Sequence, residues 1–103
     1  MKKIIYPGTF DPIHNGHIDI ARKASKLFGH LVFVIAENKG KKPFLTAKER
    51  GQLIAESTTS MKNISIDIYN GLTADYASSN NAVAIIRGLR HVSDFEFEFQ
   101  MAM

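Results

Sequence analysis

The segment from Thr9 to His17 combines the side chains best suited to holding a phosphate group. It reads Thr-Phe-Asp-Pro-Ile-His-Asn-Gly-His and follows the apolar run Ile4–Tyr6. This order predicts a strand, a tight turn and then the start of a helix. Imidazole N–H groups from His14 and His17, the Thr9 hydroxyl and free amides at the helix start would all donate to phosphate oxygens at one point.

Two other interpretations of the histidine pair stay open on the sequence alone. The imidazoles could be surface groups at the start of a helix. They could also be metal ligands, but the His-x-x-His spacing comes with no cysteine and no evident third ligand, so we predict no metal site in the protein. Asp11, which precedes Pro12, is more typical of a turn-forming residue than of a catalytic acid.

Two clusters of cations follow other apolar runs. Lys41 lies in a polar loop with Lys39 and Lys42, and Arg87 and Arg90 flank Gly88. Each cluster could be ordinary solvated surface charge. Its place directly after an apolar run favours a phosphate-binding role, and the planar guanidinium fork of arginine matches phosphate oxygens well.

The elements that must position these residues alternate between strand and helix. Alternating or continuous apolar residues predict strands, and apolar residues at a 3.6-residue period predict helices. The predicted strands are 3–6, 31–36, 64–69 and 83–86, and the predicted helices are 16–28, 46–57, 73–79 and one that starts at the capping box Ser93–Glu96. The Glu-Phe alternation from Phe95 to Phe99 also fits a strand, but the capping box favours a helix.

This order predicts an α/β fold, a Rossmann-like open parallel sheet with helices on both faces. Ligands of such sheets bind beyond the carboxyl ends of the strands, where the winding direction reverses. The Thr9–His17 turn, the lysine loop and the arginine cluster follow the first, second and fourth predicted strands. We therefore expect them to gather at one edge of the sheet, in a single domain over residues 1–103.

Composition narrows the class of protein. A chain of 103 residues that is 45% hydrophobic and 22% charged suits one globular domain. It contains no cysteine, and no apolar run approaches the ~20 residues of a membrane span, so we expect a cytoplasmic protein without membrane or disulfide. The net charge of +3 fits small anionic partners, whereas basic residues interleaved with aromatic ones, which would favour nucleic acid, are lacking.

The motifs together resemble one enzyme family. The segment Tyr6–His17 is similar to the (His/Thr)-x-Gly-His signature of the nucleotidyltransferase superfamily. Three further stretches, Lys41–Pro43, Thr46–Arg50 and Ile86–Glu96, resemble those of bacterial phosphopantetheine adenylyltransferase, and the resemblance runs in register over the whole chain. The first motif indicates the superfamily, and its combination with Arg-Gly-Leu-Arg indicates the family.

This resemblance implies transfer of the adenylyl group of ATP to 4′-phosphopantetheine, giving dephospho-CoA and pyrophosphate in coenzyme A synthesis. It further implies Mg²⁺ bound mainly through the ATP phosphates, a homohexamer, and CoA as a feedback ligand. Matched by position, the residues that would contact phosphopantetheine are Thr9, Lys41, Thr73 and Arg87. Those that would contact ATP are Thr9, Phe10, His17, Gly88, Leu89, Arg90 and Glu98. His17 would be the catalytic residue.

Members of the family carry a further strand and an Ile-Ser-Ser-type motif for the ATP phosphates after the segment matched here. The resemblance therefore implies that the C-terminal part is missing from this sequence, and we expect the 103 residues alone to bind phosphopantetheine or CoA with little adenylyl transfer. Alternative functions are a cytidylyltransferase, a nicotinate-mononucleotide adenylyltransferase, or a non-catalytic fragment that binds CoA or pantetheine.

Overall fold

Strands and helices alternate along the chain as far as the fourth strand. The computed structural model describes residues 2–37, 42–88 and 97–101, the last range through its backbone alone. Within them the strands are β1 (Lys2–Gly8), β2 (Gly29–Ala36), β3 (Ile64–Tyr69), β4 (Ala84–Gly88) and β5 (Phe97–Met101). The helices are α1 (Asn15–Phe28), α2 (Ala47–Ser57) and α3 (Thr73–Ser79). The elements from β1 to β4 confirm the predicted ones, with ends that agree to within two residues.

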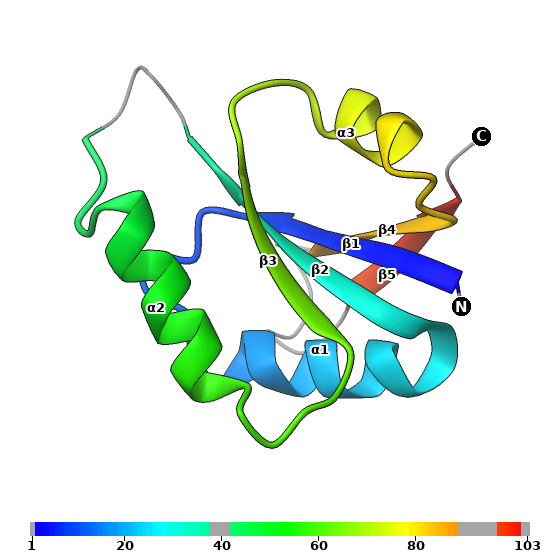
Figure 1. Cartoon of the computed structure of the whole chain (residues 1–103), viewed down its shortest axis with the longest axis horizontal. Helices are drawn as coiled ribbons and strands as arrows, with labels where there is room; N and C mark the ends of the chain where they lie inside the picture. The colour runs from blue at the N-terminus through cyan, green and yellow to red at the C-terminus, as the bar shows by residue number, and fades with distance from the viewer. Residues whose placement is uncertain (1, 38–41, 89–96, 102–103) are drawn as a thin grey trace.

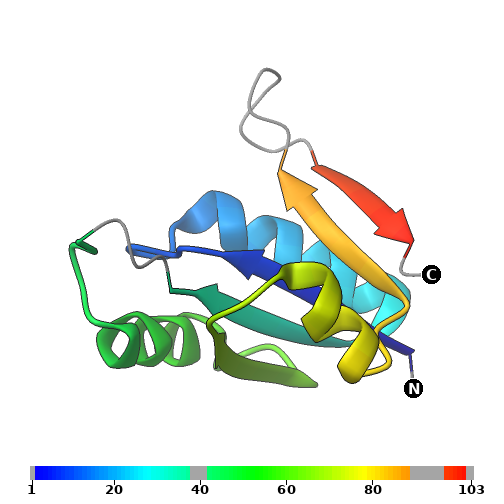
Figure 2. The same cartoon turned by 90° about the horizontal axis from the view of Figure 1, so that it is seen from above.

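The strand β1 lies at the centre of the sheet, between β2 and β4 (Figures 1 and 2). The order is β3-β2-β1-β4-β5, and the first four strands are parallel. The chain winds outward through β2 and β3, then crosses to β4 on the other side of β1. This reversal marks the carboxyl ends of β1 and β4 as the place where an open α/β sheet binds ligands.

Both faces of the central strands are covered, as the sequence predicts. The helices α1 and α2 lie on one face and α3 lies on the other (Figure 2). The first face buries Ile4, Tyr6, Leu31, Phe33, Ile35, Ile20, Ala21, Ala24 and Ile54. The second face buries Ile5, Val32, Val34, Ile85, Tyr76 and Ala77. Because successive residues of β1 and β2 point to opposite buried faces, both strands are continuous apolar runs in the sequence.

Local signals in the sequence fix the helix ends next to the sheet. The predicted capping box at the start of α2 is present, with Thr46 and Glu49 each accepting a hydrogen bond at 3.1 Å from the other's backbone N–H. The helix α1 ends at Gly29, whose φ of 99° is a conformation that favours glycine. The chain then enters β2 without a connecting loop.

The last element differs from the prediction. Residues 97–101 form β5, a strand antiparallel to β4 with Glu98 opposite Arg87, so the predicted final helix is wrong over this range. The capping box Ser93–Glu96 lies outside the described residues. A two-residue alternation prevails here because β4 would otherwise leave a row of unpaired N–H and C=O groups at the sheet edge, with which an alternating segment can pair.

A hydrogen bond between two side chains holds the short helix α3 on the sheet. The Tyr76 hydroxyl donates to Asp67 Oδ2 on β3 at 2.7 Å, and Asp67 Oδ1 accepts from Ile68 N–H at 2.8 Å. Burial, and then the Asp67 carboxylate, raises the pKa of Tyr76 well above its usual range, so the phenol keeps the proton that it donates. The helix α3 starts without a side-chain cap, and this bond together with the buried side chains of Tyr76 and Ala77 attaches it to the sheet.

We expect Tyr76→Phe to lower the free energy of unfolding by about 1 kcal/mol, the usual net contribution of such a hydrogen bond. Urea unfolding followed by circular dichroism would measure the change. Tyr69→Phe is the matched control, because the structure gives the Tyr69 hydroxyl no hydrogen-bond partner among the described residues. Equal losses in the two variants would contradict the assigned role of the Tyr76–Asp67 bond.

Candidate functional site

The turn that follows β1 is built around the buried ring of Phe10. Its ring centroid lies 5.2 Å from that of Tyr6, 5.3 Å from that of Phe33 and 5.0 Å from that of His17, all with edge-on geometry. The φ of Phe10 is 49°, a left-handed conformation that costs a non-glycine residue of order 1–3 kcal/mol. The aromatic contacts offset this cost, and the chain turns sharply to carry Thr9 and His17 to the same end of the sheet.

The two histidines cap α1 with their own side chains. His14 Nδ1 accepts a hydrogen bond from Gly16 N–H at 3.0 Å, and His17 Nδ1 accepts one from His14 N–H at 3.1 Å. The two imidazole rings stack with their centroids 3.7 Å apart. The expectation of free amides at this helix start is therefore wrong for Gly16, because His14 already satisfies its N–H.

These hydrogen bonds decide where the proton of each imidazole sits. A ring nitrogen that accepts from a backbone N–H cannot carry a hydrogen, so each neutral imidazole carries its proton on Nε2. Burial, and then the charge of His14, lowers the pKa of His17 from 6.5 to about 4. Near pH 7, His17 thus presents a neutral N–H donor, which suits a phosphoryl oxygen on which negative charge develops.

The other described site residues also lie at the carboxyl end of the sheet. Thr9 follows β1 directly and is exposed, Thr73 is the first residue of α3, and Gly88 ends β4. Strand alternation puts Arg87 on the same sheet face as Ile85, the face that α3 covers. The structure therefore gathers Thr9 and His17 around one turn and places Arg87 and Thr73 on the α3 side.

Four of the predicted site residues receive no side-chain description. Lys41, Leu89 and Arg90 lie outside the described residues. Glu98 lies in β5, opposite Arg87, rather than on the predicted helix, and only its backbone is described. The site roles of these four residues stay predictions.

Sequence reasoning missed the structural importance of two side chains, Asp11 and Arg50. Asp11 does more than form a turn, because its carboxylate accepts from the N–H groups of Phe44 and Leu45 at 2.5 and 2.8 Å. Arg50 is 2% exposed and donates to the Thr9 carbonyl at 3.0 Å. A sequence signal for Arg50 existed: it lies one helical turn before the buried Ile54, on the same face of α2.

Neither a metal cage nor a membrane span is found in the part of the chain that the structure describes. No three His, Asp or Glu side chains gather there in a way that could hold a metal ion. No helix in this part combines the length and the apolar character needed to cross a bilayer.

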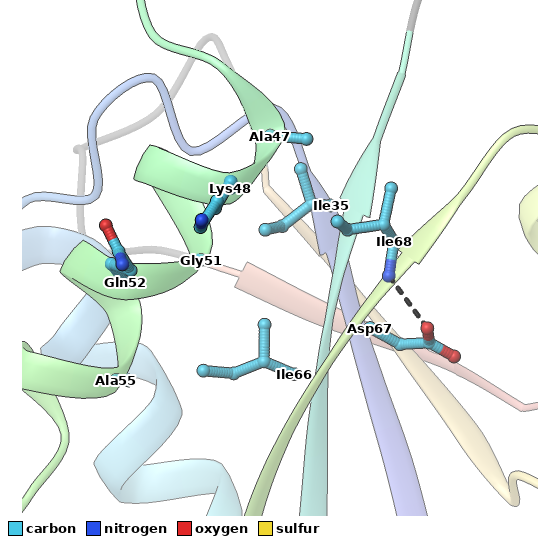
Figure 3. A pocket seen from close by; sticks show the side chains of 9 residues that line it. All are labelled: Ile35, Ala47, Lys48, Gly51, Gln52, Ala55, Ile66, Asp67 and Ile68. Carbon is cyan, nitrogen blue, oxygen red and sulfur yellow. Dashed lines mark hydrogen bonds between the residues drawn. The ribbon is translucent and has the colours of Figure 1, made fainter.

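A shallow depression lies away from the turn, between α2 and β3 (Figure 3). It encloses about 400 Å³, and apolar side chains such as Ile35 and Ile66 line most of it. In Figure 3 the dashed line marks the hydrogen bond from Ile68 N–H to Asp67. Lys48 is the one cationic side chain among the nine lining residues, so the depression is a poor match for a polyanion. The turn after β1 is therefore the better candidate site.

The low pKa of His17 predicts how stability depends on pH. Between pH 6.5 and about 4, His17 is largely protonated in the unfolded chain but not in the folded one. The free energy of unfolding therefore falls as the pH falls through this range. We expect a loss of about 1–2 kcal/mol across this window, reduced because the ring is only half-buried. Urea unfolding at several pH values would measure it. His17→Gln should lose this part of the dependence, and unchanged dependence in the variant would contradict the assignment.

Known proteins resemble this chain over its whole length. A family model described as cytidylyltransferase-like matches residues 5–103. The phosphopantetheine adenylyltransferase of Syntrophomonas wolfei is 48% identical over 103 residues, which make up 100% of this chain and 64% of that protein. The proteins of the same name from Carboxydothermus hydrogenoformans and Alkaliphilus oremlandii are 50% and 48% identical, again over 100% of this chain and over 64% and 66% of their own lengths.

A solved structure has the same fold. The lipopolysaccharide core biosynthesis protein of Thermoplasma volcanium matches with a TM-score of 0.69 and 27% identity, over 90% of this chain and 79% of that one. The chain spans 64% to 66% of the length of the adenylyltransferases named above. Since the family model covers the turn after β1 together with all the strands around it, the chain belongs to the cytidylyltransferase-like family.

Proposed function

We propose that the protein containing this chain is a phosphopantetheine adenylyltransferase, which transfers the adenylyl group of ATP to 4′-phosphopantetheine. The observation that carries the proposal is the 48–50% identity to proteins of that name over the whole of this chain. The neutral His17 donor at the reversal point of the sheet supports it, because it suits chemistry at a phosphoryl group.

This reaction needs no nucleophile from the protein. A phosphate oxygen of phosphopantetheine attacks the α-phosphorus of ATP and forms a new P–O bond. The bond from the α-phosphorus to the oxygen shared with the β-phosphorus breaks, and pyrophosphate leaves with the electron pair. The protein must hold two polyanions in line and offset their repulsion, which calls for N–H, O–H and cationic groups.

His17 and Thr9 would act on the reacting phosphates. Nε2–H of His17 would donate to an oxygen of the α-phosphate as charge develops there, and the Thr9 hydroxyl would bind a phosphate oxygen. The amino-terminal end of α1 adds the positive end of its dipole. A preorganised donor of this kind typically contributes ~10²–10³ in rate.

The two substrates would approach from different sides of the sheet end. On the α3 side, Thr73 and Arg87 would bind phosphopantetheine, and we assign Lys41 to the same substrate. On the α1 side, His17 and the backbone of Phe10, whose ring is buried, would contact ATP. The remaining ATP contacts that we propose are Gly88, Leu89, Arg90 and Glu98.

Mg²⁺ would accompany the nucleotide rather than occupy a protein cage. Magnesium in nucleotide sites is held largely by substrate phosphates and water. The residues of the turn after β1 fit this arrangement, because they supply N–H and O–H donors instead of a set of carboxylates. When bound, Mg²⁺ would neutralise charge on the phosphates of ATP.

We also propose that the protein is a cytoplasmic homohexamer that CoA regulates as a feedback ligand. The support is the similarity of the sequence to the adenylyltransferases named above. Its working partners would then be ATP and phosphopantetheine rather than nucleic acid or a membrane.

Cytidylyl transfer is the second candidate, because the matching family model is described as cytidylyltransferase-like. Isothermal titration with 4′-phosphopantetheine, nicotinate mononucleotide and CTP would separate the possibilities, together with an assay of pyrophosphate release. Release that requires both ATP and 4′-phosphopantetheine would support the proposed function. Binding of CoA or pantetheine without release would instead indicate a non-catalytic binding protein.

In the full-length protein that contains this chain, we expect His17→Ala to lower kcat by ~10² or more, with a smaller change in the KM for ATP. The reason is that the hydrogen bond from His17 should strengthen as charge develops on the phosphates. Pyrophosphate release at saturating substrates would measure this. Asp19→Asn, at a partly exposed position of α1 where Asp19 pairs with Lys23, is a control that should leave kcat unchanged. A kcat for His17→Ala within about threefold of the wild type would show that His17 only caps the helix.

We expect Lys41→Ala and Arg87→Ala to raise the KM for phosphopantetheine about tenfold or more, and Arg90→Ala to raise mainly the KM for ATP. A charge-assisted hydrogen bond contributes ~1.5–3 kcal/mol, which corresponds to at least a tenfold change in affinity. Initial rates with each substrate varied in turn would measure the split. An unchanged KM for phosphopantetheine in Lys41→Ala would remove that lysine from the site.

A further inference from the structure

Two side chains from different parts of the chain bind the backbone of the same residue, Leu45. Its N–H donates to Asp11 Oδ1 at 2.8 Å, and its carbonyl accepts from Arg50 Nε at 3.1 Å. The neighbouring N–H of Phe44 donates to the other oxygen of Asp11, so both carboxylate oxygens are engaged. The segment 42–46, which leads into α2, is therefore fastened to the turn that follows β1.

Arg50 extends this connection to the ends of two strands. Its Nη1 donates to the carbonyl of Thr9, after β1, at 3.0 Å and to that of Ala36, at the end of β2, at 3.4 Å. Its Nε also lies 3.4 Å from the Thr46 carbonyl. One guanidinium thus joins the loop after β1, the end of β2 and the entry to α2, and Figure 1 shows these segments side by side.

The hydrogen bonding of Arg50 is unusual for a buried cationic residue, whose exposed fraction is 2%. Buried charges are normally paired with an opposite charge. No carboxylate of the described residues forms an ion pair with Arg50, and backbone carbonyls take its hydrogen bonds instead. Its fork geometry is needed for these divergent bonds, which the single ammonium of lysine could not reproduce.

We propose that Asp11 and Arg50 are positioning residues, which hold the segment 42–46 against the turn carrying Thr9 and His17, and that phosphopantetheine binding depends on this attachment. The kinetic part rests on the proposed function, in which Lys41 precedes this segment in the chain and binds phosphopantetheine. Arg50 is buried, and each carboxylate oxygen of Asp11 accepts a hydrogen bond from the segment 42–46, so we assign both side chains to holding that segment rather than to binding substrate.

Amide hydrogen exchange tests the mechanical part without any substrate. In the wild type we expect the amides of Phe44 and Leu45 to be protected. Asp11→Asn replaces one acceptor oxygen by an amide donor, so exchange at one or both amides should accelerate at least tenfold. Asp19→Asn makes the same chemical change at a partly exposed position of α1, where Asp19 pairs with Lys23, and should leave both amides as in the wild type. Unchanged protection of Phe44 and Leu45 in Asp11→Asn would overturn the proposal.

A double-mutant cycle tests the positioning part. Asp11→Asn should raise the KM for phosphopantetheine about tenfold and leave the KM for ATP within about twofold of the wild-type value. The rates are measured at a temperature at which an unfolding curve shows that the variant is fully folded. In a Lys41→Ala background the same substitution should add less than about twofold, because its effect passes through that lysine. Fully additive effects, or an unchanged KM for phosphopantetheine, would overturn the positioning role.

A milder variant guards against loss of folding. Arg50→Lys keeps the positive charge but loses the forked guanidinium geometry. We expect it to raise the KM for phosphopantetheine and to accelerate amide exchange at Leu45 as Asp11→Asn does. A KM and an exchange rate equal to those of the wild type would contradict the role of Arg50. If the full-length protein that contains this chain releases no pyrophosphate from ATP and phosphopantetheine, the proposed function fails. The exchange experiment still decides whether Asp11 and Arg50 hold the segment 42–46.

Discussion

The parallel pairing of β1 with β2 on one side and β4 on the other is the constraint on which the rest of the structure depends. Both faces of β1 and β2 are buried, so a slip of one residue would turn Tyr6 and Phe33 out of one core and Ile5 and Val32 out of the other. The register is therefore fixed from the pair Lys2–Gly29 to the pair Gly8–Ile35. Since every described site residue is attached to the carboxyl end of a strand or to the helix that follows it, this register also fixes the site.

In the turn after β1, the hydrogen bonds that fold the chain also determine which nitrogen of His17 carries its proton. His17 Nδ1 satisfies a backbone donor at the start of α1, and this leaves Nε2–H as the only proton of the neutral ring. The rings of Tyr6 and Phe10 pack against that of His17, and this partial burial, together with His14, lowers the pKa of His17. A helix cap and an aromatic core together produce a neutral donor aimed away from the backbone, which is what a phosphoryl-transfer site needs.

Much of the fold could be predicted because its signals are local. The cap of α2 at Thr46 and the glycine at the end of α1 depend on a few neighbouring residues, as do the apolar runs of the buried strands. The segment 97–101 was mispredicted because its signals conflict: a capping box favours a helix and the alternation favours a strand. Pairing with β4 decided between them, and a partner that is distant in the sequence leaves no local trace.

The sequence by itself determined the α/β class, the place of the turn after β1 and the histidines that occupy it, because periodicity and residue type act over short distances. Only the tertiary structure decided that Gly16 is capped, that His17 is neutral, and that Asp11 and Arg50 fasten the entry of α2 to the strand ends. These properties arise from burial and from hydrogen bonds between residues up to 41 positions apart in the chain, as between Arg50 and Thr9. Desolvation and long-range hydrogen bonding depend on what surrounds a group in space, which the order of residues does not state.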